Sequence, residues 1–321
     1  MDLLSEVLKA VKLRGALFFN AEASAPWCLN EPGSAEIAPS LKIGSGHIVL
    51  YHFVLEGRAF ARTLDGHQED LEAGDIVVIP HGDKHVLGNG WPEKPVDAIK
   101  AFAGNLKDGL KLVRFGGGGE RTKLVCGYMV MDTQLGEVFL AGLPKMMKVR
   151  VTDEPSGQWL KTSIRLSVGD DRGCDAGSDI VIAKLSEVLF VETLRRYINS
   201  LPEEDTGWLA GARDPVIGKT LALLHIDPAH DWTIAELARR VGMSRTRLAE
   251  RFQHFIGEPP MAYLTRWRLK LGAEMLDSGR ESIAEIAAAV GYGSEATFNR
   301  AFKREYDIPP AQFRRSHQSR P

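Results

Sequence analysis

An internal repeat near the C-terminal end limits the possible folds of this chain more than any other feature. Residues 234–242 (IAELARRVG) match residues 283–291 (IAEIAAAVG) with an offset of 49 positions. After a turn the match resumes at an offset of 50, where Leu248 corresponds to Phe298, and both copies then reach a Pro-Pro pair. A repeat with one supersecondary unit in each copy predicts two similar folded units in tandem.

Each copy has the pattern of two short helices joined by a tight turn. In the second copy, Ser282 and Glu285 form a capping-box start, and Gly291 ends the apolar helical periodicity that follows them. The next helix places Phe298 and Phe302 on its buried side. Two short helices around a glycine turn are the helix-turn-helix arrangement.

The two units, joined by a long helix at about 261–278, closely resemble the DNA-binding domain of the AraC/XylS family of bacterial transcription regulators. The resemblance covers about residues 215–315. It rests on the Pro-Pro endings, the repeat spacing and the second-unit pattern Gly-Tyr-x-Ser-x-x-x-Phe-x-Arg-x-Phe-Lys-Arg. It implies an all-α domain that reads double-stranded DNA in the major groove and works with RNA polymerase. Ordinary core helices would explain one isolated copy, but they explain two copies in register poorly.

The second helix of each unit has an outward face that is expected to contact DNA. A helical wheel and the family's base-contacting positions together select a set of twelve residues: Arg245, Thr246, Arg247, Ala249, Glu250, Gln253, Glu295, Ala296, Asn299, Arg300, Lys303 and Arg304. Arg300 can donate two hydrogen bonds to a guanine edge, and Glu250 can accept one from cytosine N4. The other arginines and Lys303 are interpreted as phosphate contacts. For Arg245 and Arg304, a solvated face or an intradomain salt bridge is the alternative.

The distribution of charge agrees with a DNA-facing C-terminal domain. From residue 215 onward the chain has 16 Lys and Arg against 12 Asp and Glu, whereas the first 214 residues have 24 against 30. No apolar run is long enough to cross a membrane. Acidic residues follow Met1 where a signal peptide would have basic ones, so we expect a cytoplasmic protein with no membrane partner.

Three widely spaced cysteines, Cys28, Cys126 and Cys174, form no Cys-x-x-Cys pair. A zinc finger and a disulfide framework are therefore not expected. Cys126 lies in an expected strand and is interpreted as a small buried apolar residue. The alternative is a redox-sensing thiol at Cys126, with Cys28 as its nearest candidate partner.

The N-terminal half has the pattern of short strands separated by glycine turns. We expect strands at 47–55, 58–64, 76–79 and 124–131, loops at 26–29 and 31–39, and a short helix within residues 1–19 that leads into a strand. The glycine run 116–119 lacks the Lys and Ser or Thr of a phosphate loop, so we interpret it as a turn between strands. This spacing is typical of a β-sandwich or barrel.

Residues 74–89 (GDIVVIPHGDKHVLGN) fit the second cupin motif, G-x5-P-x-G-x2-H-x3-N, at every position. With Val54-Leu-Glu-Gly57 upstream, the region resembles the cupin sensor domain that many AraC-type regulators carry. The resemblance implies a ligand-binding barrel, and His52 and His85 are candidate ligand contacts. Metal-binding cupins also have a His-x-His pair and a glutamate, but the corresponding positions, near 43–46 and at Leu50, contain neither. We therefore expect no metal ion and no other cofactor.

Residues 158–200 have helical periodicity, which is clearest at 180–198. There Val181, Leu185, Val188 and Leu189 belong to a wide apolar stripe that serves either the core or a dimer surface. Residues 201–207 have the composition of a linker.

These patterns together predict a multidomain α and β protein. We expect a cupin-like β-barrel at 1–135, a helical segment at 136–213 that links or dimerises, and an AraC-type DNA-binding domain at 214–321, with helix-turn-helix units at about 233–257 and 282–306. The expected function is sequence-specific transcription regulation under the control of a small-molecule or redox effector. It is not expected to be an enzyme. A metal-dependent cupin enzyme fused to a DNA-binding module, and a constitutive DNA-binding protein with a dimerisation barrel, are the alternatives. Activation and repression are both open at this point.

Overall fold

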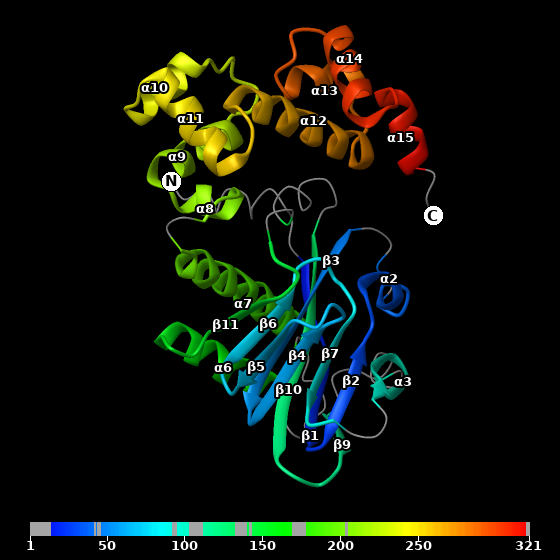
Figure 1. Cartoon of the computed structure of the whole chain (residues 1–321). Helices are drawn as coiled ribbons and strands as arrows, with labels where there is room; N and C mark the ends of the chain where they lie inside the picture. Colours follow the sequence, from blue (N-terminus) through cyan, green and yellow to red (C-terminus); the bar gives the residue numbers. More distant parts are fainter. Residues whose placement is uncertain are drawn as a thin grey trace. The chain divides into compact units, whose positions relative to one another are not determined.

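A computed structural model describes residues 14–41, 43, 46–91, 95–102, 112–131, 140, 143–168, 178–202 and 205–318. The described residues form two compact units (Figure 1). One lies within Leu13–Asp132 and Leu143–Ser200, and the other consists of Leu140 and the described part of Leu201–Pro321. Most of the N-terminal helix expected within residues 1–19 lies outside the described residues.

The first unit is built from two β-sheets that face each other. The six-stranded sheet has the order β11 (Met147–Arg150), β6 (Asp75–Ile79), β3 (His47–Glu56), β10 (Arg121–Met131), β1 (Arg14–Ser24) and β9 (Leu112–Gly116). The five-stranded sheet has the order β5 (Gln68–Glu72), β4 (Arg58–Thr63), β7 (His85–Asn89), β2 (Trp27–Glu31) and β8 (Val96–Asp97). The short helices α2 (Ser34–Ile37) and α3 (Ala98–Phe102) complete this part (Figure 1). The predicted cupin-like β-domain is confirmed.

Strand β3 is buried on both faces, which explains its long apolar sequence. Ile48, Leu50 and Val54 point into the core between the two sheets, because alternate residues of a strand face the same side. The other side of this sheet is covered by α6 (Pro155–Val168) and α7 (Ser178–Ser200). A strand that is covered on both sides has a continuous apolar run instead of an alternating one.

Two loop predictions in this unit are wrong. Residues 27–31 form strand β2, and residues 34–37 form helix α2. The β2 run is short and carries weak local signals, but pairing with β7 and burial of Trp27 and Leu29 in the core stabilise it as a strand.

The segment at 136–213, predicted to link or dimerise, is divided between the two units. Strand β11 pairs with β6, and helix α7 packs on β1, so Leu143–Ser200 completes the barrel unit, whereas residues 201–213 belong to the helical unit. The predicted apolar stripe of α7 is divided between the core and the surface. Leu185 and Leu189 are buried, but Val181 and Val188 are 52% and 47% exposed. The face of α7 that packs against the sheet is centred on Ile182, Leu185 and Leu189.

The second unit is entirely helical and contains the predicted repeat. It comprises α8 (Trp208–Arg213), α9 (Pro215–Ile226), α10 (Ile234–Val241), α11 (Arg245–Ile256), α12 (Pro260–Ser278), α13 (Ile283–Ala289), α14 (Glu295–Tyr306) and α15 (Pro310–Gln318). Helices α10 and α11 correspond to α13 and α14, which confirms the two helix-turn-helix units. Among the described residues, no helix has the length and apolarity needed to span a bilayer.

Candidate functional site

The second helix of each helix-turn-helix unit begins at a serine cap. The side chain of Ser244 accepts a hydrogen bond from the backbone N–H of Arg247, and that of Ser294 accepts one from Thr297. These bonds satisfy amide groups that the helix itself leaves free. They fix where α11 and α14 begin, and therefore which side chains face outward.

The buried residues of these helices are those that the sequence predicted. Leu248 and Phe252 of α11 and Phe298 and Phe302 of α14 have no exposed surface. The twelve predicted DNA-facing residues lie on the opposite sides, where ten are exposed and two, Ala249 and Asn299, are partly buried. The geometry therefore leaves these faces available to a major groove.

An ion pair that the sequence did not reveal holds α11 in place. The carboxylate of Asp214 accepts hydrogen bonds from the backbone N–H groups of Val216 and Ile217 at the start of α9, and it also binds the guanidinium of Arg251 on α11. Burial alone would raise the pKa of Asp214, but the bonds from Arg251 and Ile217 outweigh it and lower the pKa. One carboxylate thus caps α9 and orients the second helix of the first helix-turn-helix unit.

Inside the barrel, four polar residues lie opposite one another as two cross-strand pairs. His52 on β3 is paired with Cys126 on β10 in the six-stranded sheet, and Glu31 on β2 is paired with His85 on β7 in the five-stranded sheet. Each occupies an inward position, since its neighbours two residues away belong to the core. All four are buried, with 6% or less of their surface exposed.

A chain of hydrogen bonds links three of these residues. The Nδ1 atom of His85 lies 2.9 Å from the carbonyl oxygen of Asp83, and its Nε2 atom lies 2.6 Å from Nε2 of His52. Because the carbonyl only accepts, Nδ1 of His85 carries the proton, and neutral His85 then accepts at Nε2 from His52. The Nδ1 lone pair of His52 therefore faces Sγ of Cys126, 2.8 Å away.

Burial favours the neutral form of every member of this cluster. It raises the pKa of Glu31 to about 8, and it lowers that of His85 to about 4 despite the opposing effect of Asp83. Burial, followed by the nearby His85, lowers the pKa of His52. Burial and the charge of Glu31 raise the pKa of Cys126.

The structure separates the two cysteines that the sequence offered as a redox pair. Cys126 belongs to the core between the sheets, whereas Cys28 packs with Phe60 and Val86 on the other side of the five-stranded sheet. Both are buried and free. Burial raises the pKa of Cys28 as well, so neither thiol has the exposed thiolate character of a redox sensor. A direct Cys28–Cys126 disulfide is incompatible with this fold, and Cys174 lies outside the described residues.

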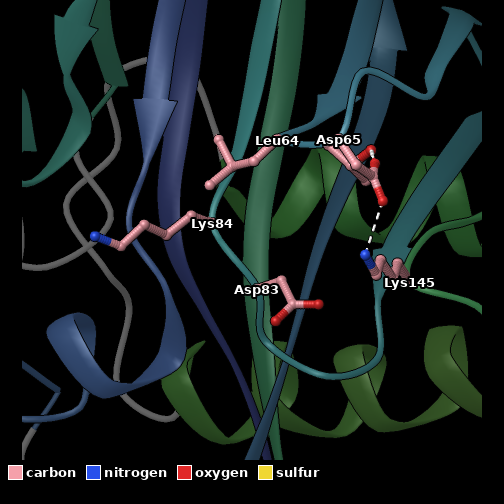
Figure 2. Close-up of a pocket in the computed structure, with 6 residues that line it drawn as sticks. Leu64, Asp65, Asp83, Lys84 and Lys145 are labelled. Atoms are coloured by element: carbon pink, nitrogen blue, oxygen red, sulfur yellow. Dashed lines mark hydrogen bonds and ion pairs between the residues drawn. The ribbon is translucent and has the colours of Figure 1, made fainter.

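A pocket of about 320 Å³ opens at the surface of the barrel unit beside this cluster. Its lining residues are Thr63, Leu64, Asp65, Asp83, Lys84 and Lys145. In Figure 2, Asp65 and Lys145 face each other at one side of the pocket, where their charged groups are 2.7 Å apart, and Lys84 extends away from them. Thr63 is paired with His85 across two strands, so the pocket lies next to the buried cluster.

The ligand positions of a standard metal-binding cupin do not fit a metal here. Leu50, which occupies the glutamate position, packs in the apolar core and offers no ligand atom. Glu31 is the member of the buried cluster that the sequence analysis missed. The signal that could have identified it is the spacing of Trp27, Leu29 and Glu31, which places all three on one face of strand β2.

Comparisons with known proteins agree with this organisation. Residues 2–199 match a family model described as a cupin, and residues 237–316 match one described as a helix-turn-helix domain. A protein of Streptomyces lividans described as an AraC-like transcription regulator is 32% identical over 320 residues, which cover 98% of each chain. The HTH-type transcriptional regulator AlkR of Acinetobacter baylyi is 27% identical over 318 residues, covering 98% of this chain and 99% of that one. Among solved structures, the DNA-binding domain of AdpA in complex with a target DNA is 25% identical, with a TM-score of 0.32, over 33% of this chain and 96% of that one.

Proposed function

This chain belongs to the AraC-type transcription regulators that carry a cupin domain, and from that premise we propose that α11 and α14 read its operator while an effector acts on the barrel. As a member of the family it is a DNA-binding transcription regulator. The observation that carries the proposal is the pair of capped helices whose outward faces present polar and basic side chains.

The residues on these faces fall into two groups, those whose side chains match base edges and those that suit phosphate groups. Arg300 and Glu250 are exposed and have side chains that match base edges, so they are assigned to sequence recognition. Arg245, Arg247, Lys303 and Arg304 are exposed cations that suit phosphate groups. Within the described residues no ion pair engages Arg300, which leaves its guanidinium available to DNA.

We expect Arg300→Ala to weaken operator binding by about 1–3 kcal/mol and to relax the preference at one base pair. The reason is the loss of two hydrogen bonds to one guanine edge. The measurement is competition binding at fixed salt against a set of operators that carry single base-pair changes.

The matched control is Lys303→Ala, one turn along the same exposed face. Because Lys303 is proposed to contact a phosphate, Lys303→Ala is expected to weaken binding to all DNA sequences equally. It should also reduce the slope of log K against log salt by about 1. If Arg300→Ala also weakens every operator equally, its role in base recognition is refuted.

The effector is assigned to the surface pocket of the barrel unit that Asp65 and Lys145 line. Its volume, about 320 Å³, suits a small molecule, and its lining offers both carboxylates and ammonium groups. Hydrogen bonds from Lys145 and Thr63 lower the pKa of Asp65 to about 2, so the ion pair stays charged at neutral pH. We assign a polar or zwitterionic effector to this pocket.

Lys145→Ala is expected to abolish the change in gene expression that the effector causes. Operator affinity should stay unchanged, because Lys145 belongs to the pocket and not to the helical unit. The response is measured with a reporter fused to the gene's own upstream DNA, and affinity is measured by gel shift. Lys184→Ala is the matched control, since Lys184 forms an exposed ion pair with Glu187 on α7 outside the pocket. Normal induction in the Lys145 variant would rule out this pocket as the effector site.

Self-association and contact with RNA polymerase stay predictions.

A further inference from the structure

The buried cluster of the barrel contains three groups of the types that bind transition metals. One carboxylate oxygen of Glu31, one ring nitrogen of His52 and Sγ of Cys126 all lie within 4.8 Å of one another. A tetrahedral zinc ion, with bonds of about 2.0 Å to nitrogen and oxygen and about 2.3 Å to sulfur, keeps its ligand atoms about 3–4 Å apart. Small side-chain rotations are therefore enough to accommodate the ion.

His52 is oriented as a metal ligand requires. Its Nδ1 lone pair faces Cys126, while its Nε2 atom is hydrogen-bonded to His85, which is held in turn by the carbonyl of Asp83. A metal-bound histidine in proteins usually donates its other ring N–H to a partner of this kind, which fixes both tautomer and ring orientation.

Glu31 is the member of the cluster that needs explanation. Only 6% of its surface is exposed, and within the described part of the chain no hydrogen bond or ion pair reaches its carboxylate. Burying a carboxyl group without a partner is unfavourable, and such groups are rare in folded proteins. A cation between the two sheets would supply the missing partner.

We propose that Glu31, His52 and Cys126 bind one divalent transition-metal ion of the zinc type between the two sheets of the barrel. Binding forms metal–oxygen, metal–nitrogen and metal–sulfur bonds and releases two protons, one from the carboxyl and one from the thiol, with no change of oxidation state. The resulting site is neutral because two anionic ligands balance the ion. The fourth tetrahedral position is open to water or to another ligand.

This ligand set differs from the standard cupin arrangement and from the expectation that the chain binds no metal. Its three members come from β2, β3 and β10, and the position at which a standard cupin would supply a glutamate is Leu50. Thiolate together with imidazole favours zinc and similar ions over magnesium or calcium. The inference goes beyond the proposed regulation and does not depend on it.

The test uses the full chain, without a histidine tag, purified from zinc-supplemented cells and desalted. Metal content is measured by inductively coupled plasma mass spectrometry. We expect about one zinc per chain in the wild type and in Cys28→Ser, whose thiol lies outside the core, and little in Glu31→Gln and Cys126→Ser. Operator affinity of the same samples reports that the helical unit is intact.

A second measurement keeps the proposal testable if a variant folds poorly. The chelated wild type is titrated with Co²⁺, and we expect a thiolate-to-cobalt charge-transfer band that saturates at about one equivalent. The band should persist in Cys28→Ser and be absent in Cys126→Ser. A wild type that takes up neither ion, or a band that survives Cys126→Ser, would overturn the site. Normal operator binding by a metal-free chain would leave the proposed function untouched.

Discussion

Phe302→Ala is expected to lower the free energy of unfolding of the second helix-turn-helix unit by about 3–5 kcal/mol. Phe302 has no exposed surface, and its ring lies 4.4 Å from that of Tyr306 and 5.3 Å from that of Phe313, measured between centroids. The alanine would leave a cavity where α14 meets α15. Because the typical stability of a whole domain is about 5–15 kcal/mol, a loss of this size removes much of the unit's stability.

The effect should be confined to one of the two repeats. The core cluster around Phe302 contains residues of α12, α13, α14 and α15 and none from α10 or α11. Hydrogen exchange is therefore expected to accelerate in α13–α15 and to change little in α10 and α11. Thermal unfolding followed by circular dichroism gives the loss of stability.

Lys303→Ala is the control for this substitution, since Lys303 is the next residue of α14 and is exposed. A surface change of that kind is expected to stay within about 0.5 kcal/mol. Equal destabilisation by the two variants would contradict the assignment of Phe302 to the core. The Phe302 variant should also lose the DNA contacts that we propose for α14.

Gly291→Ala is the second change with a large expected effect, and Gly242→Ala is its counterpart in the first repeat. Both glycines follow the first helix of a unit in the left-handed conformation, with φ of 84° and 72°. An alanine in that conformation costs about 1–2 kcal/mol at either position. The two sites differ in the space around them.

A Cβ atom at Gly291 would lie 2.8 Å from both Cα and O of Ala229 and 2.9 Å from Cζ of Arg268, whereas one at Gly242 would meet nothing within 4 Å. Arg268 has little freedom to move, since it donates hydrogen bonds to the carbonyl groups of Pro228 and His230. Forcing these groups apart adds about 1–3 kcal/mol. Gly291→Ala should therefore destabilise the protein more than Gly242→Ala.

Chemical denaturation of both glycine variants, compared with the wild type under the same conditions, measures this difference directly. The expected order of midpoints is wild type, then Gly242→Ala, then Gly291→Ala. Equal midpoints for the two variants would show that the backbone near Ala229 moves freely, and the packing between the second turn and the loop after α9 would then contribute little.

The recognition helices show what kind of feature the sequence predicts well. Their buried positions and their outward faces follow from helical periodicity within about twelve residues, and the structure has them where periodicity placed them. The Asp214–Arg251 ion pair cannot be predicted in this way, because it depends on tertiary packing and not on a local pattern. Its two members are 37 positions apart and meet only because α9 packs against α11.

The two helix-turn-helix units, the outward faces of their second helices and the β-rich nature of the N-terminal half could be predicted from the sequence alone, because each depends on local patterns and on a repeat. The tertiary structure decided which distant residues meet. Glu31, His52, His85 and Cys126 lie on four strands, and only strand pairing and the packing of two sheets bring them together. A shift of one residue in any of these strands would turn its side chain to the other face, and no local pattern specifies the partner or register of a strand. The same packing placed Cys28 away from Cys126 and joined α7 to the barrel.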